Sequence, residues 1–440
     1  MMKKLILASF LAALASTQWA CEGADNGFSA GDADGDSDSD SDGDSDGDSD
    51  GDSDSDTGPA GPSGTIQGTV WAPTGTFPIS GALVYVTDGN ANAIQDNAYC
   101  YECDDMTGKK WTLSGPDGSW VLDGVPAGTH NLVTRKGFFQ RQRPITVEGG
   151  DTPQDIPAET TTLPADSTDD GLDTIPNYAV LLNGWDLPED MLAKMGLGSL
   201  TSSGNLDTTQ PYSFDLFDDL NTDTNGTSLG DSSLLFTSQE TLEHYHMVFF
   251  PCVCSHLNAT SYTTMLQSYV EDGGKIYGSC WAGQWIEVPF PDLITWHGGD
   301  SGTSPGDVGP YNTTGIINDE NMRAWLAVVA PGQNLDAYSF DEGWINLDGL
   351  TTGAYEGMGL DTDGGWVVPK VWVTDNGASG YSVAGDPMTV TFNYGCGKLF
   401  YSTYQVVENT PSVAIRPQEK VLIYMFFEVG VCEGTYIPPE

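Results

Sequence analysis

Basic side chains are scarce in this chain. Its 440 residues carry 15 lysines and arginines against 63 aspartates and glutamates, and the formal net charge is −48. Such a charge argues against nucleic acid and anionic membrane surfaces as partners, because both are themselves negative. The acidity indicates a well-solvated surface, and it leaves cations and neutral or cationic polymers as candidate partners.

Long apolar runs are absent after the first 20 residues. Residues 5–15, LILASFLAALA, follow two lysines and are too few to span a bilayer permanently. This pattern predicts an export signal at residues 1–20. Cleavage at an A-x-A site within the run would give a secreted protein, whereas cleavage before Cys21 would give a lipoprotein. We favour the lipoprotein, anchored through Cys21 at the outer membrane or cell surface, because a tether-like tract follows.

Large apolar residues are missing from residues 32–56, where aspartate occupies every second position. Such a tract cannot bury a core and its charges repel one another, so we expect residues 21–64 to form an extended, disordered tether. The letters DADGD resemble part of a calcium loop, but the closing glutamate and the flanking helices are lacking. We therefore expect neither a formed metal site nor a cofactor.

Cysteines are few, yet their number is informative. Outside the cytosol they are expected in disulfides, and seven remain after Cys21, so at least one stays free or pairs between chains. Cys100 and Cys103 form a C-x-x-C motif with no second such motif or histidine pair nearby, which argues against zinc and favours a local disulfide. Cys396 and Cys432 are expected to form another bridge. The full set of disulfide candidates is Cys100, Cys103, Cys252, Cys254, Cys280, Cys396 and Cys432.

Residues 65–160 show short alternating runs such as TIQGTVWAP and ALVYVT, separated by the turn signals PDG, DG and PAG. This pattern predicts a small β-sandwich. The stretch GTVWAP…PISGALVYV…GPDGSWVLDGVPAGTHNLVTRKGFF resembles the carboxypeptidase regulatory-like family. That resemblance implies a transthyretin-like, seven-stranded folding or binding module without catalytic residues. Residues 161–173 are polar and are predicted to be a linker.

From residue 174 to residue 440 the pattern changes to strands alternating with helices. NYAVLLNG, LEHYHMVFFPC and KIYGSC read as strands, while PEDMLAKMGL, SYTTMLQSYVEDGG, NDENMRAWLAVV and PQEKVLIYMFFEVG read as helices. MTVTFNYGCGKLFYSTYQ reads as a hairpin. The alternation predicts a parallel, three-layer α/β sheet.

The segment GGKIYGSCWAGQ, residues 273–284, places a cysteine in a turn after a strand. Together with the strand and helix pattern, it resembles the class I glutamine amidotransferase-like superfamily, whose elbow reads G-x-C-x-G-x-Q. Gly278, Cys280 and Gln284 match, and Ala282 replaces the second glycine. The resemblance implies a flavodoxin-like fold and a nucleophile's position for Cys280.

The same resemblance places the catalytic base after the last long strand, where this chain has Gln405. Val407 takes the place of the glutamate that follows the base. Glutamine cannot accept a proton near neutral pH, so the nucleophile–base pair of the family is broken.

Two interpretations of Cys280 remain open. His256 follows a neighbouring strand and would be a substitute base in a Cys280–His256 dyad. A disulfide from Cys280 to Cys252 or Cys254 is favoured, because adjacent strand ends bring cysteines within bridging distance. His244 and His246 precede their strand and are expected to be surface or strand-start residues.

We therefore expect an exported, lipid-anchored cell-envelope protein with a binding or structural role and a catalytically degenerate amidotransferase-like domain. One alternative is a cysteine-dependent hydrolase of extracellular amides or glycans that uses Cys280. Another is a carbohydrate-binding surface protein, because Trp281, Trp285 and Trp296 are close to the elbow in the sequence and aromatic faces stack on sugars. The expected partners are the membrane, through the lipid anchor, and an extracellular polymer or protein ligand.

Overall fold

The computed structural model describes residues 61–219, 226–252, 256–299, 305–351, 353–354, 366–367, 369–406 and 412–432. The predicted export signal, Cys21 and the predicted tether up to residue 60 lie outside these ranges, as does Cys254. Residues Pro59–Glu440 form one compact unit, and every contact described below lies within it.

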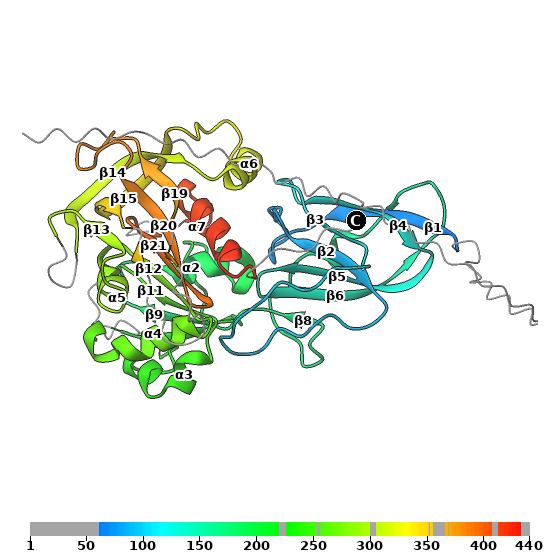
Figure 1. Ribbon diagram of the computed structural model, residues 1–440, viewed down its shortest axis with the longest axis horizontal. Coiled ribbons are helices and arrows are strands. Elements are labelled where there is room, and N and C mark those ends of the chain that lie inside the picture. The colour runs from blue at the N-terminus through cyan, green and yellow to red at the C-terminus, as the bar shows by residue number, and fades with distance from the viewer. Residues whose placement is uncertain are drawn as a thin grey trace, which may run out of the picture. The chain divides into compact units, whose positions relative to one another are not determined.

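The first part of this unit is made of two β-sheets (Figure 1). One contains β4 (Ser119–Pro126), β1 (Ser63–Thr69) and β7 (Gln154–Asp155), in that order. The other has the order β3 (Trp111–Leu113), β2 (Leu83–Thr87), β5 (Gly128–Lys136), β6 (Phe139–Val147) and β8 (Asp173–Thr174). The predicted linker therefore begins at the end of the short helix α1 (Ala158–Thr161) and ends in a strand paired with β6.

The second part is built on a nine-stranded sheet. Its parallel half has the order β10 (Asp215–Asp218), β9 (Tyr178–Leu182), β11 (Met247–Phe250), β12 (Lys275–Ser279) and β21 (Gly397–Ser402). The antiparallel half continues with β20 (Pro387–Tyr394), β19 (Lys370–Asp375), β14 (Asp307–Ile317) and β15 (Tyr338–Ile345). Shorter pairs join β13 (Ile294–Trp296) to β16 (Leu347–Leu350) and β17 (Gly353–Ala354) to β18 (Trp366–Val367).

Helices cover both faces of this sheet, because alternate residues of each buried strand point to opposite sides. Tyr178 and Val180 of β9 pack in one core with α2 (Pro188–Leu192), α6 (Glu320–Val329) and α7 (Pro417–Glu428). Ala179 and Leu181 pack in another with α3 (Gln239–Glu243), α4 (Thr263–Glu271) and α5 (Gln284–Glu287). The first core also contains the residues between the two sheets of the sandwich, so the two parts share apolar packing.

The protein is thus mostly β-sheet, in several sheets, with helices added in its second part. The predicted first helix is shorter than expected: α2 passes into a π-helical segment, η1 (Ala193–Leu197), in which Gly196 has φ 105°. The predicted helical segment NDENMRAWLAVV begins at Asn318, whereas helix α6 is capped one residue later by Asp319, which accepts from the Met322 N–H at 2.7 Å. None of the described helices has the length and apolar character that crossing a bilayer demands.

Two disulfides join the two parts of the unit. Cys100 is bonded to Cys396 and Cys103 to Cys432, with Cα atoms 5.0 and 4.9 Å apart. The predicted Cys100–Cys103 and Cys396–Cys432 bridges are therefore wrong. The reason is packing: a Cβ on Gly273, in the loop before β12, would lie 2.0 Å from the carbonyl oxygen of Tyr99, so the C-x-x-C segment rests on the second part.

His246 lies at the same contact, directly before β11, as its expected place at a strand start implied, and its side chain is buried. Its Nδ1 accepts from the Asn177 N–H at 2.9 Å, its Nε2 donates to the Gln95 carbonyl at 2.9 Å, and its ring packs 4.4 Å from that of Phe138. Burial lowers the pKa of His246 to about 3. The imidazole is therefore neutral in the folded protein at neutral pH.

This burial predicts a loss of stability in acid. Above pH 6.5 the histidine is neutral in both states, whereas below it only the unfolded chain takes up the proton, until the pH reaches about 3. We expect His246 to cost about 1.4 kcal/mol of unfolding free energy per pH unit in that window. Urea unfolding of the unaltered protein and of His246→Gln, from pH 7 to pH 5, measures this pH dependence of the unfolding free energy. The stability advantage of histidine should shrink with falling pH, and a constant difference would contradict the assignment.

Candidate functional site

The cysteine elbow has the backbone of a nucleophile turn. Strand β12 ends at Ser279, Cys280 follows with φ 49°, and a 3₁₀ turn, η4 (Cys280–Gly283), leads into α5. A left-handed conformation costs a residue with a side chain about 1–2 kcal/mol. The same strained strand-to-helix turn lifts the nucleophile of α/β hydrolases above their sheet.

The sulfur of Cys280, however, is bonded to that of Cys252. Their Cα atoms are 4.8 Å apart, because β11 and β12 are parallel neighbours in which Phe250, the last residue of β11, pairs with Gly278, the last but one of β12. Cys252 is one of the two partners that the sequence suggested; Cys254, the other, lies outside the described residues. Cys280 is fully buried, and the N–H of Trp281 points to the Cys252 sulfur at 3.4 Å. That N–H corresponds to an oxyanion donor in enzymes with such an elbow, and here it already has an acceptor.

The position expected for the base holds Gln405, which is buried. Its side-chain amide donates to Glu342 Oε2 at 3.1 Å, and its backbone carbonyl oxygen accepts from the Gln418 side chain at 3.4 Å. Val407 and Glu408 lie outside the described residues. Gln405 therefore serves as a hydrogen-bonding link between the end of β21, strand β15 and helix α7, and it cannot take a proton from a thiol.

His256 does not form a pair with Cys280 in the described structure. Its Nδ1 contacts the carbonyl and carboxylate of Asp219, and its Nε2 lies 3.5 Å from Asp231 Oδ2. The ring is thus held between two acidic residues beside β10, at the far edge of the parallel half. The substitute dyad considered from the sequence has no support in this arrangement.

Asp186, which the sequence analysis missed, links four strand ends. It follows β9, is fully buried, and accepts from the Cys252 N–H at 3.0 Å, from the Ser279 hydroxyl and from the Val406 N–H at 2.7 Å. Burial raises the pKa of this carboxyl, while these donors act in the opposite direction. The signal was available, since polar residues at the carboxyl ends of parallel strands converge at one edge of a sheet.

Two further acids follow in α2. Burial raises the pKa of Glu189, and Asp190 beside it raises it further; burial also raises the pKa of Asp190 to about 6. Asp190 is satisfied by the Leu206 N–H at 2.6 Å and the Asn205 amide at 3.1 Å. Among the described residues no cluster of three or more potential ligands is arranged to hold a metal ion. The carboxyl edge of the sheet around Cys280 is thus occupied by a disulfide and by the hydrogen bonds of buried carboxylates.

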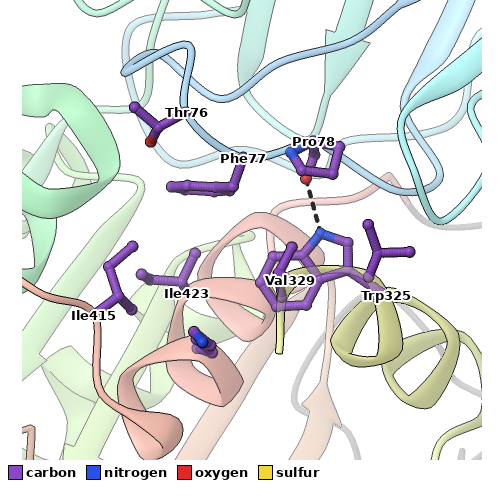
Figure 2. A pocket seen from close by; sticks show the side chains of 9 residues that line it. Thr76, Phe77, Pro78, Trp325, Val329, Ile415 and Ile423 are labelled. Atoms are coloured by element: carbon purple, nitrogen blue, oxygen red, sulfur yellow. Dashed lines mark hydrogen bonds between the residues drawn. The ribbon is translucent and has the colours of Figure 1, made fainter. Parts of the chain in front are cut away.

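A separate concave feature lies where the sandwich meets α6 and α7. Figure 2 shows Phe77 above Ile415 and Ile423, with Trp325 to their right. The cavity has a volume of about 330 Å³ and is lined by Thr76, Phe77, Pro78, Trp325, Val328, Val329, Ile415, Lys420 and Ile423. No sequence pattern pointed to it, because three segments that are distant in the chain contribute to it.

Comparisons with known proteins identify no family. No protein-family model and no curated protein sequence matches the chain. Among solved structures, a cytoplasmic Salmonella typhimurium protein, STM3548, is 9% identical, with 58% of this chain and 99% of that one covered and a TM-score of 0.33. A β-galactosidase from Bacillus circulans is 11% identical over 58% of this chain, with a TM-score of 0.27. A candidate carbohydrate binding protein from Bacteroides uniformis is 14% identical over 22% of this chain, with a TM-score of 0.16.

The chain spans only 41% of the Bacteroides protein and 30% of the β-galactosidase. All of these TM-scores are too low for the similarity to define the fold or the function of the chain.

Proposed function

We propose that the chain is an exported cell-envelope protein, lipid-anchored through Cys21, with a binding or structural role and no cysteine-based catalysis. The observation that carries the proposal is the bond between Cys280 and Cys252 at the one position where an elbow would present a nucleophile. A sulfur in a disulfide cannot become a thiolate, which is the nucleophile of cysteine-based catalysis. It therefore cannot start an acyl-transfer reaction.

The disulfides also support an extracytoplasmic location. Six cysteines form three bridges, two of which hold distant parts of the chain together. Structural disulfides form and persist in oxidising compartments and are rare in the cytosol. This agrees with the apolar segment at residues 5–15, which we interpret as part of an export signal.

The domain assignment belongs to the same proposal. The parallel strands follow the spatial order β10, β9, β11, β12 and β21, which is the 2-1-3-4-5 order of flavodoxin-like sheets. With the elbow after the fourth of these strands, the order supports a degenerate amidotransferase-like domain. The two facing sheets before residue 175 support the carboxypeptidase regulatory-like sandwich.

Thiol labelling tests the proposal. We expect the folded, non-reduced protein to show no modification of Cys280 by iodoacetamide near neutral pH, with peptide mass spectrometry as the readout, and no amidase or glutaminase turnover. Cys252→Ala releases the Cys280 thiol; without a base that thiol should react slowly, since an isolated cysteine has a pKa near about 8.5. Rapid labelling of Cys280 at pH 6 that is abolished by His256→Ala would favour the hydrolase.

Carbohydrate binding is the second candidate, and tryptophans at the carboxyl edge of the sheet favour it. Trp185, which follows β9, is 54% exposed. Trp281 and Trp344 are half-buried with ring centroids 5.1 Å apart, and the Trp281 indole N–H donates to Asp307 Oδ1 at 3.3 Å. Aromatic rings stack on the faces of sugar rings, and carboxylates beside them accept hydrogen bonds from the sugar hydroxyls.

A further inference from the structure

The cavity between the sandwich and helices α6 and α7 has an apolar body. Seven of the residues that line it have aliphatic or aromatic side chains or are proline. The Trp325 indole N–H is already used, because it donates to the Pro78 carbonyl at 2.8 Å (Figure 2). The Thr76 hydroxyl is hydrogen-bonded to that of Thr74 at 2.7 Å. The polar groups of these residues are thus directed at protein atoms.

Lys420 is the exception. It lines the cavity from α7, and within the described parts of the chain no hydrogen bond or ion pair of its ammonium is recorded. Burial lowers the pKa of this ammonium, and among the described residues no carboxylate counteracts that effect. Seven other basic residues form ion pairs: Arg135, Lys136, Arg141, Arg143, Lys194, Arg323 and Lys370. In a chain with 63 acidic residues, an uncompensated lysine in an apolar cavity calls for an explanation.

We propose that this cavity binds a small amphipathic acid, whose apolar body fills the space between Phe77, Trp325 and Ile423 and whose carboxylate pairs with Lys420. Small-molecule sites are mostly apolar clefts of about 300–1,000 Å³ at the junctions of domains, with a few polar groups that set orientation. At the packing density of protein interiors, the observed volume accommodates about ten to fifteen non-hydrogen atoms. A medium-chain fatty acid has this size and this single charge.

The proposal deepens the binding role proposed above, and the test keeps the two separable. Decanoate serves as the probe and decanol as its neutral counterpart, each titrated calorimetrically into the full chain below the concentration at which decanoate forms micelles. Lys420→Met removes the charge and keeps most of the side-chain volume. Lys110→Met removes the same charge from an exposed site on the sandwich and is the matched control.

We expect decanoate to bind about tenfold more tightly than decanol, which corresponds to one charge-assisted contact at a partly exposed site. Lys420→Met should abolish that preference and Lys110→Met should keep it. Val328→Trp, at a lining position that is 41% exposed and therefore tolerant of a larger side chain, should block both ligands. Equal affinities for acid and alcohol, an unchanged preference in Lys420→Met, or no binding at all would overturn the proposal, while the Cys280 labelling result would stand by itself.

Discussion

Removing both disulfides between the two parts of the protein is expected to cost about 10 kcal/mol, which is comparable to the whole stability of an ordinary domain. Removing either one alone is expected to cost about 4 kcal/mol. The difference arises because the bridges share a ring. While Cys100–Cys396 is intact, Cys103–Cys432 closes a ring of only about 40 residues, made of 100–103 and 396–432.

Without that first bridge, the second closes a ring that spans 329 residues of sequence separation. In the chain-entropy model the stabilisation grows with the logarithm of the ring size, so the last bridge to be removed contributes the most, about 6 kcal/mol. The effect acts on the unfolded chain, and the folded contacts between the parts, such as the Lys136–Glu428 ion pair at 2.7 Å, remain in every variant.

Paired serine substitutions avoid leaving a single reactive thiol. The three variants are Cys100→Ser with Cys396→Ser, Cys103→Ser with Cys432→Ser, and all four together, each compared by urea unfolding under non-reducing conditions. The Cys252–Cys280 bridge closes a separate ring. Replacing this pair by serine as well should add its own loss of unfolding free energy to that of either single-bridge variant. If the fourfold variant unfolds at the urea concentration of the unaltered protein, these pairings do not constrain the chain as described.

Some of the architecture follows from short-range sequence patterns. Buried parallel strands have continuous apolar runs, so β9, β11 and β12 were predicted where the structure has them, and Gly278 with Cys280 marked the turn after β12. Strand β1 begins two residues before the predicted start of the sandwich. The antiparallel strands β14, β15 and β19 were not predicted, because their partly exposed residues give only weak alternation.

The cysteine pairing and the cavity could not be predicted, since both depend on how distant segments pack. Four cysteines allow three connectivities, and the short spacing between Cys100 and Cys103 favoured the local one. The observed bridges exist because the segment around Tyr99 lies against Gly273. Asp186 could have been predicted in part. Its position after a parallel strand places it at the carboxyl edge of the sheet, but its hydrogen bonds to residues after three other strands follow only from the folded structure.

Replacing Lys194 by methionine is expected to destabilise the protein by about 3–5 kcal/mol. Lys194 lies in η1 and donates to Glu419 Oε1, near the start of α7, at 2.6 Å; the two side chains are 2% and 0% exposed. Breaking a buried pair leaves the remaining charge without its partner and without water, and that desolvation is the main cost. Glu419 Oε2 keeps its bond from the Arg416 N–H at 2.7 Å, which cannot replace the ammonium.

Glu419→Gln should cost a similar amount, because it leaves the ammonium of Lys194 unpaired. The double variant, Lys194→Met with Glu419→Gln, should recover most of the loss, since both charges are gone and glutamine can still accept from Arg416. Lys370→Met is the exposed control: its pair with Asp319 has a lysine that is 50% exposed, and we expect a loss below about 1 kcal/mol. Urea unfolding of the four variants at pH 7 decides the matter. A double variant that is as unstable as the sum of the two single variants would show that the pair contributes through its packing and not through its charges.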